Sequence, residues 1–336
     1  MSDRSSTHLH PLPAAHPLRA RATLWLMAAT GLWGLSFPLA KALGIAQRAH
    51  LPGADSWFLA AMPLVFRFGV SAAVLLVLSA GTLRRFTRNE AWQGFGLGVF
   101  AAGGMLLQMD GLSYTAASTS AFLTSCYCVT IPVIVACQRR RWPPALVVVS
   151  CGLVLVGMAI LAGVDWQTLH LGRGEWETIL ASFFFAGQIF WLERPRFAGN
   201  RTAHATILMF ATLAAAAAPV MLLRCRVPGD IAVATTASPP IVALLLALTV
   251  LCTLLTFTVM NHWQKYLEAT EAGLIYCVEP VATSLFALFL PTALGAFAGV
   301  SYPNEPLTWR LLLGGLLITA ANVAIQFKPR AVTPVQ

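Results

Sequence analysis

Residues 239–260 read PPIVALLLALTVLCTLLTFTVM, a stretch without one charged side chain. It is long enough to cross the hydrocarbon layer of a bilayer as an α-helix, which takes about 20 apolar residues. Inside lipid every backbone N–H and C=O group must find its partner within the protein, so only helices and closed barrels span a membrane. Alternating apolar and polar residues, the pattern of a barrel strand, are absent here. The stretch therefore predicts a membrane-spanning helix.

The whole chain shares this composition. Of its 336 residues, 57% are hydrophobic and 10% are charged, whereas a soluble domain carries about 25% charged residues. So little charge cannot cover a surface exposed to water, which excludes a soluble enzyme. We predict an all-α integral membrane protein with ten transmembrane helices. Apolar runs recur at 23–43, 57–79, 92–109, 114–137, 144–163, 175–192, 204–223, 239–260, 272–295 and 307–327.

Basic residues cluster between the apolar runs. The net charge is +9, and short arginine clusters lie at 84–88, 139–141 and 194–201. Cytoplasmic loops of membrane proteins carry an excess of Lys and Arg. With a cytoplasmic N-terminus, 15 of these residues fall in inside segments and six in outside segments. The bias predicts a multi-pass protein of the inner (plasma) membrane with both termini cytoplasmic, and it makes the lipid bilayer, not a nucleic acid, the partner of the basic charge.

Two segments in different halves of the chain align with each other. Residues 112–128, LSYTAASTSAFLTSCYC, match residues 264–280, QKYLEATEAGLIYCVEP, at an offset of 152. Each half then holds five predicted spans, and because five is odd the halves cross the membrane in opposite senses. Inverted repeats of this kind are the architecture of many secondary transporters. The predicted units are a disordered cytoplasmic tail at 1–22, a first five-helix repeat at 23–163, a linker at 164–174, a second five-helix repeat at 175–328 and a cytoplasmic tail at 329–336.

Several motifs carry a resemblance to a known family. They are GLWGLSFPLAKAL at 31–43, VFRFGVS at 65–71, GLSYTAASTSAFLTS at 111–125, YCVEPVATSLFAL at 276–288 and EPLT at 305–308. In this order and spacing they resemble the EamA-type transporters of the drug/metabolite transporter superfamily. The resemblance implies a bundle of ten helices, a central cavity and alternating access. It leaves the substrate open, because members of the family carry many kinds of metabolite and drug.

Two charged side chains fall inside predicted spans, where charge is costly and usually marks a pathway or an ion pair. Glu279 directly precedes Pro280, which cannot donate to the helix ladder and so frees carbonyl groups within the span. A carboxylate there could bind a cation, a proton or an amine, or it could satisfy neighbouring groups structurally. Arg67 could hold the carboxylate of a substrate, pair with Glu279 or lock two helices together. The sequence leaves these alternatives open.

Uncharged side chains complete the predicted site. Trp33 and Phe37 are four residues apart and share a helix face, and aromatic faces suit apolar or cationic ligands. Polar groups in the spans either hold helices together or line a cavity; they are Gln108, Thr124, Tyr127, Gln188, Asn261, His262 and Tyr276. We predict a substrate-binding cavity lined by Trp33, Phe37, Arg67, Tyr127, Gln188, Tyr276 and Glu279.

Enzyme motifs are absent from the sequence. It holds no Walker A loop, no H-E-x-x-H and no G-x-S-x-G, which are signatures of nucleotide, zinc and acyl-transfer chemistry. We therefore predict no enzyme activity, no cofactor and no metal. The predicted function is secondary transport, in the export direction, of a small organic metabolite or drug, with protons as a candidate coupling ion. A lipid-linked substrate flippase and an intramembrane enzyme stay as alternatives, and the protein is left open as a monomer or a homodimer.

Overall fold

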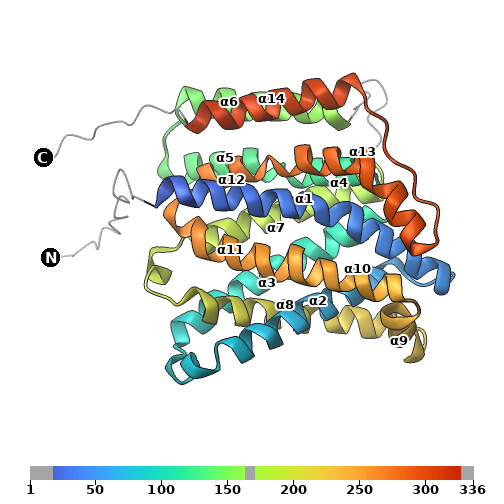
Figure 1. Cartoon of the computed structure of the whole chain (residues 1–336). Helices are drawn as coiled ribbons and strands as arrows, with labels where there is room; N and C mark the ends of the chain where they lie inside the picture. Colours follow the sequence, from blue (N-terminus) through green and yellow to red (C-terminus); the bar gives the residue numbers. More distant parts are fainter. Residues whose placement is uncertain (1–17, 163–170, 327–336) are drawn as a thin grey trace, which may run out of the picture.

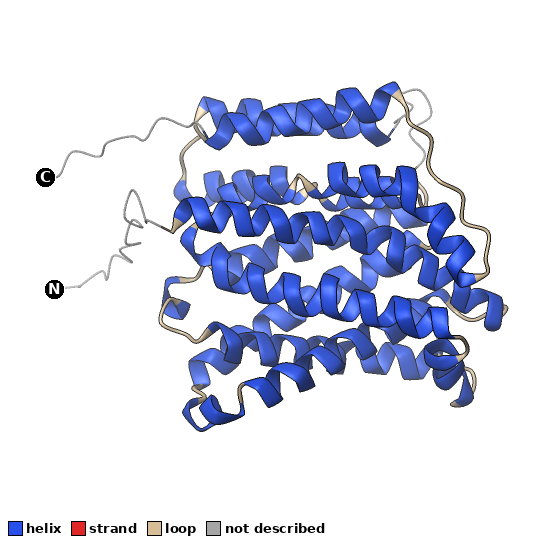
Figure 2. Ribbon diagram, viewed as in Figure 1, coloured by secondary structure: helices blue, strands red, loops and turns tan. Residues whose placement is uncertain are grey.

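The computed structural model describes residues 18–162 and 171–326. The described residues form helices joined by loops, and no strand occurs among them (Figure 2). The expectation of an all-α protein is therefore confirmed for this part of the chain. Most of the two predicted tails and most of the predicted linker lie outside the described residues.

Helices of the first half of the chain are continuous except at one place. They are α1 (Arg19–His50), α2 (Ser56–Leu78), the 3-10 helix η1 (Ala80–Arg85), α3 (Arg88–Leu112), α4 (Ala117–Thr124), α5 (Tyr127–Arg139) and α6 (Ala145–Ala162). The predicted tail ends earlier than expected, because α1 begins at Arg19 and not at Thr23. Its first turn carries Arg19 and Arg21, and apolar periodicity alone does not reveal a helix start made of arginines.

The second half contains more interruptions. Its helices are α7 (Arg173–Leu192), η2 (Pro195–Phe197), α8 (Thr202–Arg224), α9 (Gly229–Thr236), α10 (Pro239–Thr249), the π-helical segment η3 (Val250–Leu255), α11 (Thr256–Trp263), η4 (Gln264–Tyr266), α12 (Ala269–Tyr276), α13 (Glu279–Ala298) and α14 (Trp309–Gln326). A helix, or a set of consecutive helices, lies at each of the ten predicted runs. Seven of these segments are long and apolar enough to cross a membrane, by length and composition. These helices are compatible with a multi-pass membrane protein.

The helices run back and forth between the two ends of one bundle (Figure 1). We call the end where α1 begins and α14 ends the terminal face, and the opposite end the distal face. The arginine-rich connections after α2, α5 and α7 all lie at the terminal face (Figure 1). The basic clusters of the sequence are thus gathered at one end of the bundle.

Layers of helices surround the middle of the bundle (Figure 1). The pair α6 and α14 forms one edge, and α2 with α8 forms the opposite edge. Between them, α1 packs against α13, and α3 packs against both α7 and α8. The main hydrophobic core extends through this central region.

Small residues let helices approach closely, as is common in membrane proteins. A Cβ atom placed on Gly94 would lie 2.8 Å from the Cβ atom of Leu208 in α8, and one on Gly98 would lie 2.7 Å from the carbonyl oxygen of Met209. Gly34 of α1 makes the same kind of contact with Ala282 of α13. The GxxxG pair of α3 is therefore a packing motif.

Two long helical runs are interrupted near their middle. Between α4 and α5, the N–H groups of Ser125 and Cys126 bond three residues back instead of four. Between α12 and α13, the N–H groups of Cys277 and Val278 do the same. Pro280 follows at the start of α13, so the helix break predicted from its missing N–H group is confirmed.

Replacing Gly94 by Ala tests the α3–α8 contact. We expect a loss of about 1–3 kcal/mol in stability, because the added methyl group collides with α8. The loss is measured as a lower melting temperature of the purified protein in detergent. Gly69→Ala in α2 is the matched control: nothing lies within 4 Å of its Cβ position, so the helix-favouring alanine should keep or raise the melting temperature. Equal melting curves for both variants would contradict the packing argument.

Candidate functional site

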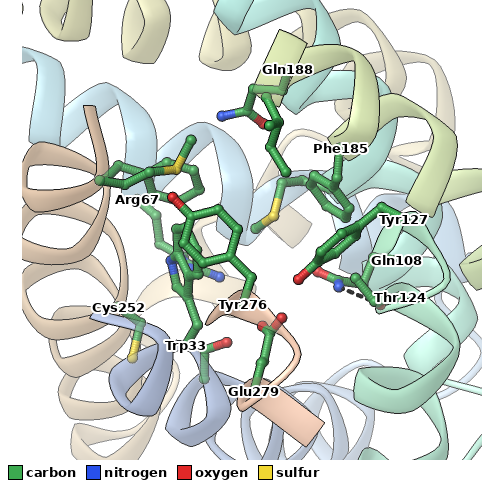
Figure 3. Close-up of a pocket in the computed structure, with 15 residues that line it drawn as sticks. Trp33, Arg67, Gln108, Thr124, Tyr127, Phe185, Gln188, Cys252, Tyr276 and Glu279 are labelled. Carbon is green, nitrogen blue, oxygen red and sulfur yellow. Dashed lines mark hydrogen bonds between the residues drawn. The ribbon is translucent and has the colours of Figure 1, made fainter. Parts of the chain in front are cut away.

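A cavity lies between the interrupted helices, with side chains converging on it from several helices (Figure 3). Its volume is about 60 Å³, room for a few water molecules in this conformation. Most of its surface is aromatic or aliphatic, with a few polar groups, which is the usual make-up of a small-molecule site. It is lined by Trp33, Ser36, Arg67, Met105, Gln108, Thr124, Tyr127, Phe185, Gln188, Ile189, Cys252, Phe257, Met260, Tyr276 and Glu279.

The helix interruptions place two of these side chains. Tyr127 is the first residue of α5 and Glu279 is the first residue of α13. The two positions are also the ones that the internal alignment pairs. In Figure 3 the carboxylate of Glu279 and the hydroxyl of Tyr127 point into the same space. Each interruption thus brings the start of a half-helix to the cavity.

The π-helical segment places the buried cation. Arg67 is 1% exposed, and its Nε atom donates to Oγ1 of Thr253 at 3.0 Å. Thr253 lies in η3, and its hydroxyl donates to the carbonyl oxygen of Leu248, five residues back, at 3.0 Å. Extra-wide turns of this kind often occur at functional sites. Here the turn supplies the hydroxyl that orients the guanidinium.

The two charged groups of the cavity are not joined to each other. Glu279 is 7% exposed, and among the described residues neither it nor Arg67 forms an ion pair. The direct pairing that the sequence allowed is therefore not formed in this structure. A buried charge without a partner is costly, so both groups are positioned for a ligand, a proton or water.

Neutral donors in the cavity are also unpartnered. Nε1 of Trp33 and Nε2 of Gln188 are buried and have no hydrogen-bond partner among the described residues. Buried donors usually have a partner, so these two are available to a bound molecule. Gln108, in contrast, donates to Oγ1 of Thr124 at 2.8 Å, which fixes its amide beside the cavity.

Aromatic rings form one wall. The ring of Trp33 lies edge-on to Phe257 at 5.2 Å and to Tyr276 at 5.4 Å between centroids. Phe257 in turn packs on Phe68 at 5.6 Å. Edge-to-face pairs at these distances are favourable, and they hold the Trp33 ring against the cavity.

A chain of hydrogen bonds connects the cavity to the terminal face. The hydroxyl of Tyr276 donates to Oε1 of Gln264 at 2.9 Å. The amide of Gln264 donates to the carbonyl oxygen of Ile189 at 3.4 Å and, at 3.5 Å, to Oε1 of Glu193. Glu193 follows the end of α7, outside the helix, and burial raises its pKa to about 8. These contacts lie on the terminal side of the cavity and are made by uncharged and readily protonated groups.

Six of the seven predicted site residues line the cavity, and Phe37 does not. It lies one turn further along α1 than Trp33 and packs with Leu112, Ala117 and Ala121. Ser36, one residue before Phe37, does line the cavity, so the cavity reaches this level of α1 and Phe37 packs on another side of the helix. That part of the prediction is corrected.

Other polar candidates divide in the same way. Gln108 and Thr124 line the cavity, whereas Asn261 donates to Thr206 of α8 at 3.0 Å and His262 packs on aromatic rings near the terminal face. Cys252 also lines the cavity and was not predicted, because the π-helical turn that contains it leaves no signal in the apolar run. Ser36 and Met105 were also missed, although each lies three residues from a predicted polar or aromatic candidate and thus on its helix face.

The side chains that line the cavity have the chemistry of a site that recognises small molecules. They offer one guanidinium, one carboxylate, amide and phenol groups, and aromatic faces. Among residues 18–162 and 171–326, no three His, Cys, Asp or Glu side chains are grouped so that they could hold a metal ion. These groups can offer hydrogen bonds and ring contacts, and the carboxyl of Glu279 can take up or release a proton.

Comparisons with known proteins inform the fold. No protein-family model matches the chain, and no curated protein matches it significantly. Among solved structures, a protein crystal structure aligns with a TM-score of 0.61 at 19% sequence identity, over 91% of this chain and 96% of that one. At this identity the likeness shows a shared fold alone.

The buried Glu193 carboxyl predicts a pH-dependent stability. Its pKa in the folded protein is about 8, above the ordinary value, so the fold favours the neutral form. Its stabilising contribution is complete below about pH 4.3 and is lost as the pH rises through 8, with a slope of up to about 1.4 kcal/mol per pH unit. We expect the melting temperature to fall between about pH 5 and 8 and to level off above about pH 8, measured by thermal denaturation in detergent.

Glu193→Gln should flatten this dependence, because the amide stays neutral throughout. Glu175→Gln, at the other end of α7, is the control and should leave the slope unchanged. A wild-type slope that Glu193→Gln does not reduce would show that other groups cause it.

Proposed function

We propose that this protein is a secondary transporter that exports a small organic metabolite or drug across the inner membrane. The observation that carries the proposal is the central cavity, where an unpaired Arg67, an unpaired Glu279 and two unpartnered donors meet aromatic rings. Irregular helices at membrane depth are tolerated where they line such a cavity. Transporters typically build their substrate sites from discontinuous helices of this kind.

An inverted repeat of two five-helix halves supports this proposal. Exchanging the halves relates α1, α2, α3, α4–α5 and α6 to α7, α8, α10–α11, α12–α13 and α14. The contacts of α1 with α12 and α13 then correspond to those of α7 with α4 and α5, and the contact of α3 with α8 corresponds to that of α10 with α2. The pairs α2–α8 and α6–α14 map onto themselves. Helix interruptions fall at corresponding places in α4–α5 and α12–α13.

Alternating access follows from this arrangement. The two halves would rock against each other around the cavity and open it to one face at a time. On the terminal side, opening requires breaking the contacts between Tyr276, Gln264 and Glu193. Glu279 carries the coupling proton in this proposal, because it is the one carboxyl group among the residues that line the cavity.

Flux into proteoliposomes tests the function. A panel of amino acids, nucleosides and quaternary-amine dyes is offered with and without a pH gradient, and at least one class should move. Glu279→Gln should lower the flux of that class about tenfold or more and remove its dependence on the gradient, because an amide cannot carry the proton.

Glu175→Gln, a carboxyl that does not line the cavity, is the matched control and should behave as wild type. Both variants are checked for monodispersity, so that misfolding is not counted as lost transport. Unchanged flux and unchanged pH dependence in Glu279→Gln would remove the coupling role. A panel without any protein-dependent flux would remove the transporter.

Orientation in the membrane is tested with single cysteines. Cys137 lies near the end of α5 at the terminal face, and Cys225 follows α8 at the distal face. In a cysteine-free background, a membrane-impermeant maleimide added to intact cells should label Cys225. Cys137 should react only after permeabilisation, since the basic terminal face is proposed to be cytoplasmic. The reverse pattern would invert the proposed topology.

A further inference from the structure

A second cavity lies on the distal side of the first, between α1, α2 and α3. Its volume is about 170 Å³. Three of its lining residues are cations, namely Lys41, Arg48 and Arg67, and none is acidic. A cavity whose charged lining residues are all cations has a positive potential and attracts anionic ligands. The apolar wall strengthens this field because its dielectric constant is low.

Arg67 belongs to both cavities. It is shared by the central cavity and the second one, and among the described residues Thr253 holds its guanidinium through Nε. A guanidinium has five N–H donors in a planar fork that matches a carboxylate or a phosphate. The terminal nitrogens of Arg67 have no acidic partner among the described residues. Their N–H groups are therefore available to a ligand in either cavity.

The three cations form a series toward the distal face. Arg67 is 1% exposed, Lys41 is partly buried and Arg48 is exposed. Lys41 and Arg48 are seven residues apart in α1, so two helical turns separate them on one face. Each successive cation is thus nearer to solvent than the one before.

One carboxylate, that of Glu305, acts on this series of three cations. The ammonium group of Lys41 donates to the carbonyl oxygen of Thr115, and Glu305 is the acid that acts on it. The carboxylate of Glu305 is itself held by the hydroxyl and N–H groups of Ser118. Arg48 forms no ion pair within the described part of the chain.

We propose that the cargo leaves through this second cavity and carries an oxyanion group, a carboxylate or a phosphate, which Arg67 binds. Lys41 and Arg48 then receive that group on its way to the distal face. This inference rests on the proposed transport function and adds the chemical class of its substrate. Glu279 keeps its separate role on the central cavity.

Three probes of one shape test the charge requirement. Phenylacetate and phenyl phosphate carry the two oxyanions, and phenylacetamide is the neutral counterpart of the first. Their phenyl ring suits the aromatic and aliphatic walls. Binding to the full-length protein in detergent is measured by thermal stabilisation and by quenching of tryptophan fluorescence. We expect at least one oxyanion to bind about tenfold or more tighter than the amide, the difference that charged hydrogen bonds give.

Arg67→Gln and Lys41→Gln should each reduce this preference, and Arg67→Lys should keep part of it because it keeps the charge. Arg310→Gln removes an exposed arginine that lines neither cavity, and it should bind the probes as wild type does. If Arg67→Gln does not fold, Arg67→Lys and Lys41→Gln still decide the result. Equal binding of amide and oxyanions, no binding of either oxyanion, or an unchanged preference in Arg67→Lys and Lys41→Gln would overturn the proposal.

Flux of the same probes separates this inference from the transport function. Oxyanion-selective flux that Lys41→Gln diminishes supports both. Oxyanion-selective binding without flux would keep the anion site and remove the transporter. Flux of the amide equal to that of phenylacetate would keep the transporter and overturn the anion site.

Discussion

A membrane interior offers no water to satisfy a backbone group, and this constraint explains where the helices of this protein are irregular. Regular α-helices satisfy their own groups and can face lipid, whereas an interruption must be covered by protein or must line a cavity. The breaks at 125–126 and 277–278 adjoin the central cavity, and the π-helical segment at 250–255 adjoins it through Cys252, while Val250 and Leu255 of that segment are exposed. These three irregular segments therefore supply groups to one cavity.

Buried charge follows from the same arrangement. Arg67 and Glu279 line one cavity without forming an ion pair, so each keeps the capacity to respond to a ligand or a proton. If the cargo is an anion, the membrane potential itself favours its export, since moving one charge across 100 mV is worth about 2.3 kcal/mol. Proton coupling through Glu279 would then add to the driving force for export that the membrane potential already supplies.

Much of the fold could be predicted from the sequence, because the length of an apolar run and the chemistry of proline are local properties. Pro280 predicted its helix break, and the internal alignment paired Tyr127 with Glu279, but the break before Tyr127 was not predicted. The cavity itself depends on how each helix is rotated and shifted against its neighbours, which one sequence does not encode. Phe37 was therefore assigned to the cavity, whereas it packs with Leu112, Ala117 and Ala121. Thr253 and Gln264 were missed, since the partners that give them a role lie in other helices.

The two sides of the central cavity differ in a way that bears on direction. Toward the terminal face, Tyr276 and Gln264 lead to a Glu193 carboxyl that burial keeps neutral up to a pKa of about 8. Toward the distal face, Arg67 leads to further cations. Neutral groups can form and break contacts with little change in solvation, which suits a closing surface. Fixed cations lower the energy of an anion along a path, which suits an exit. In the proposed transport cycle, the terminal side would therefore close the cavity and the distal side would release the anion.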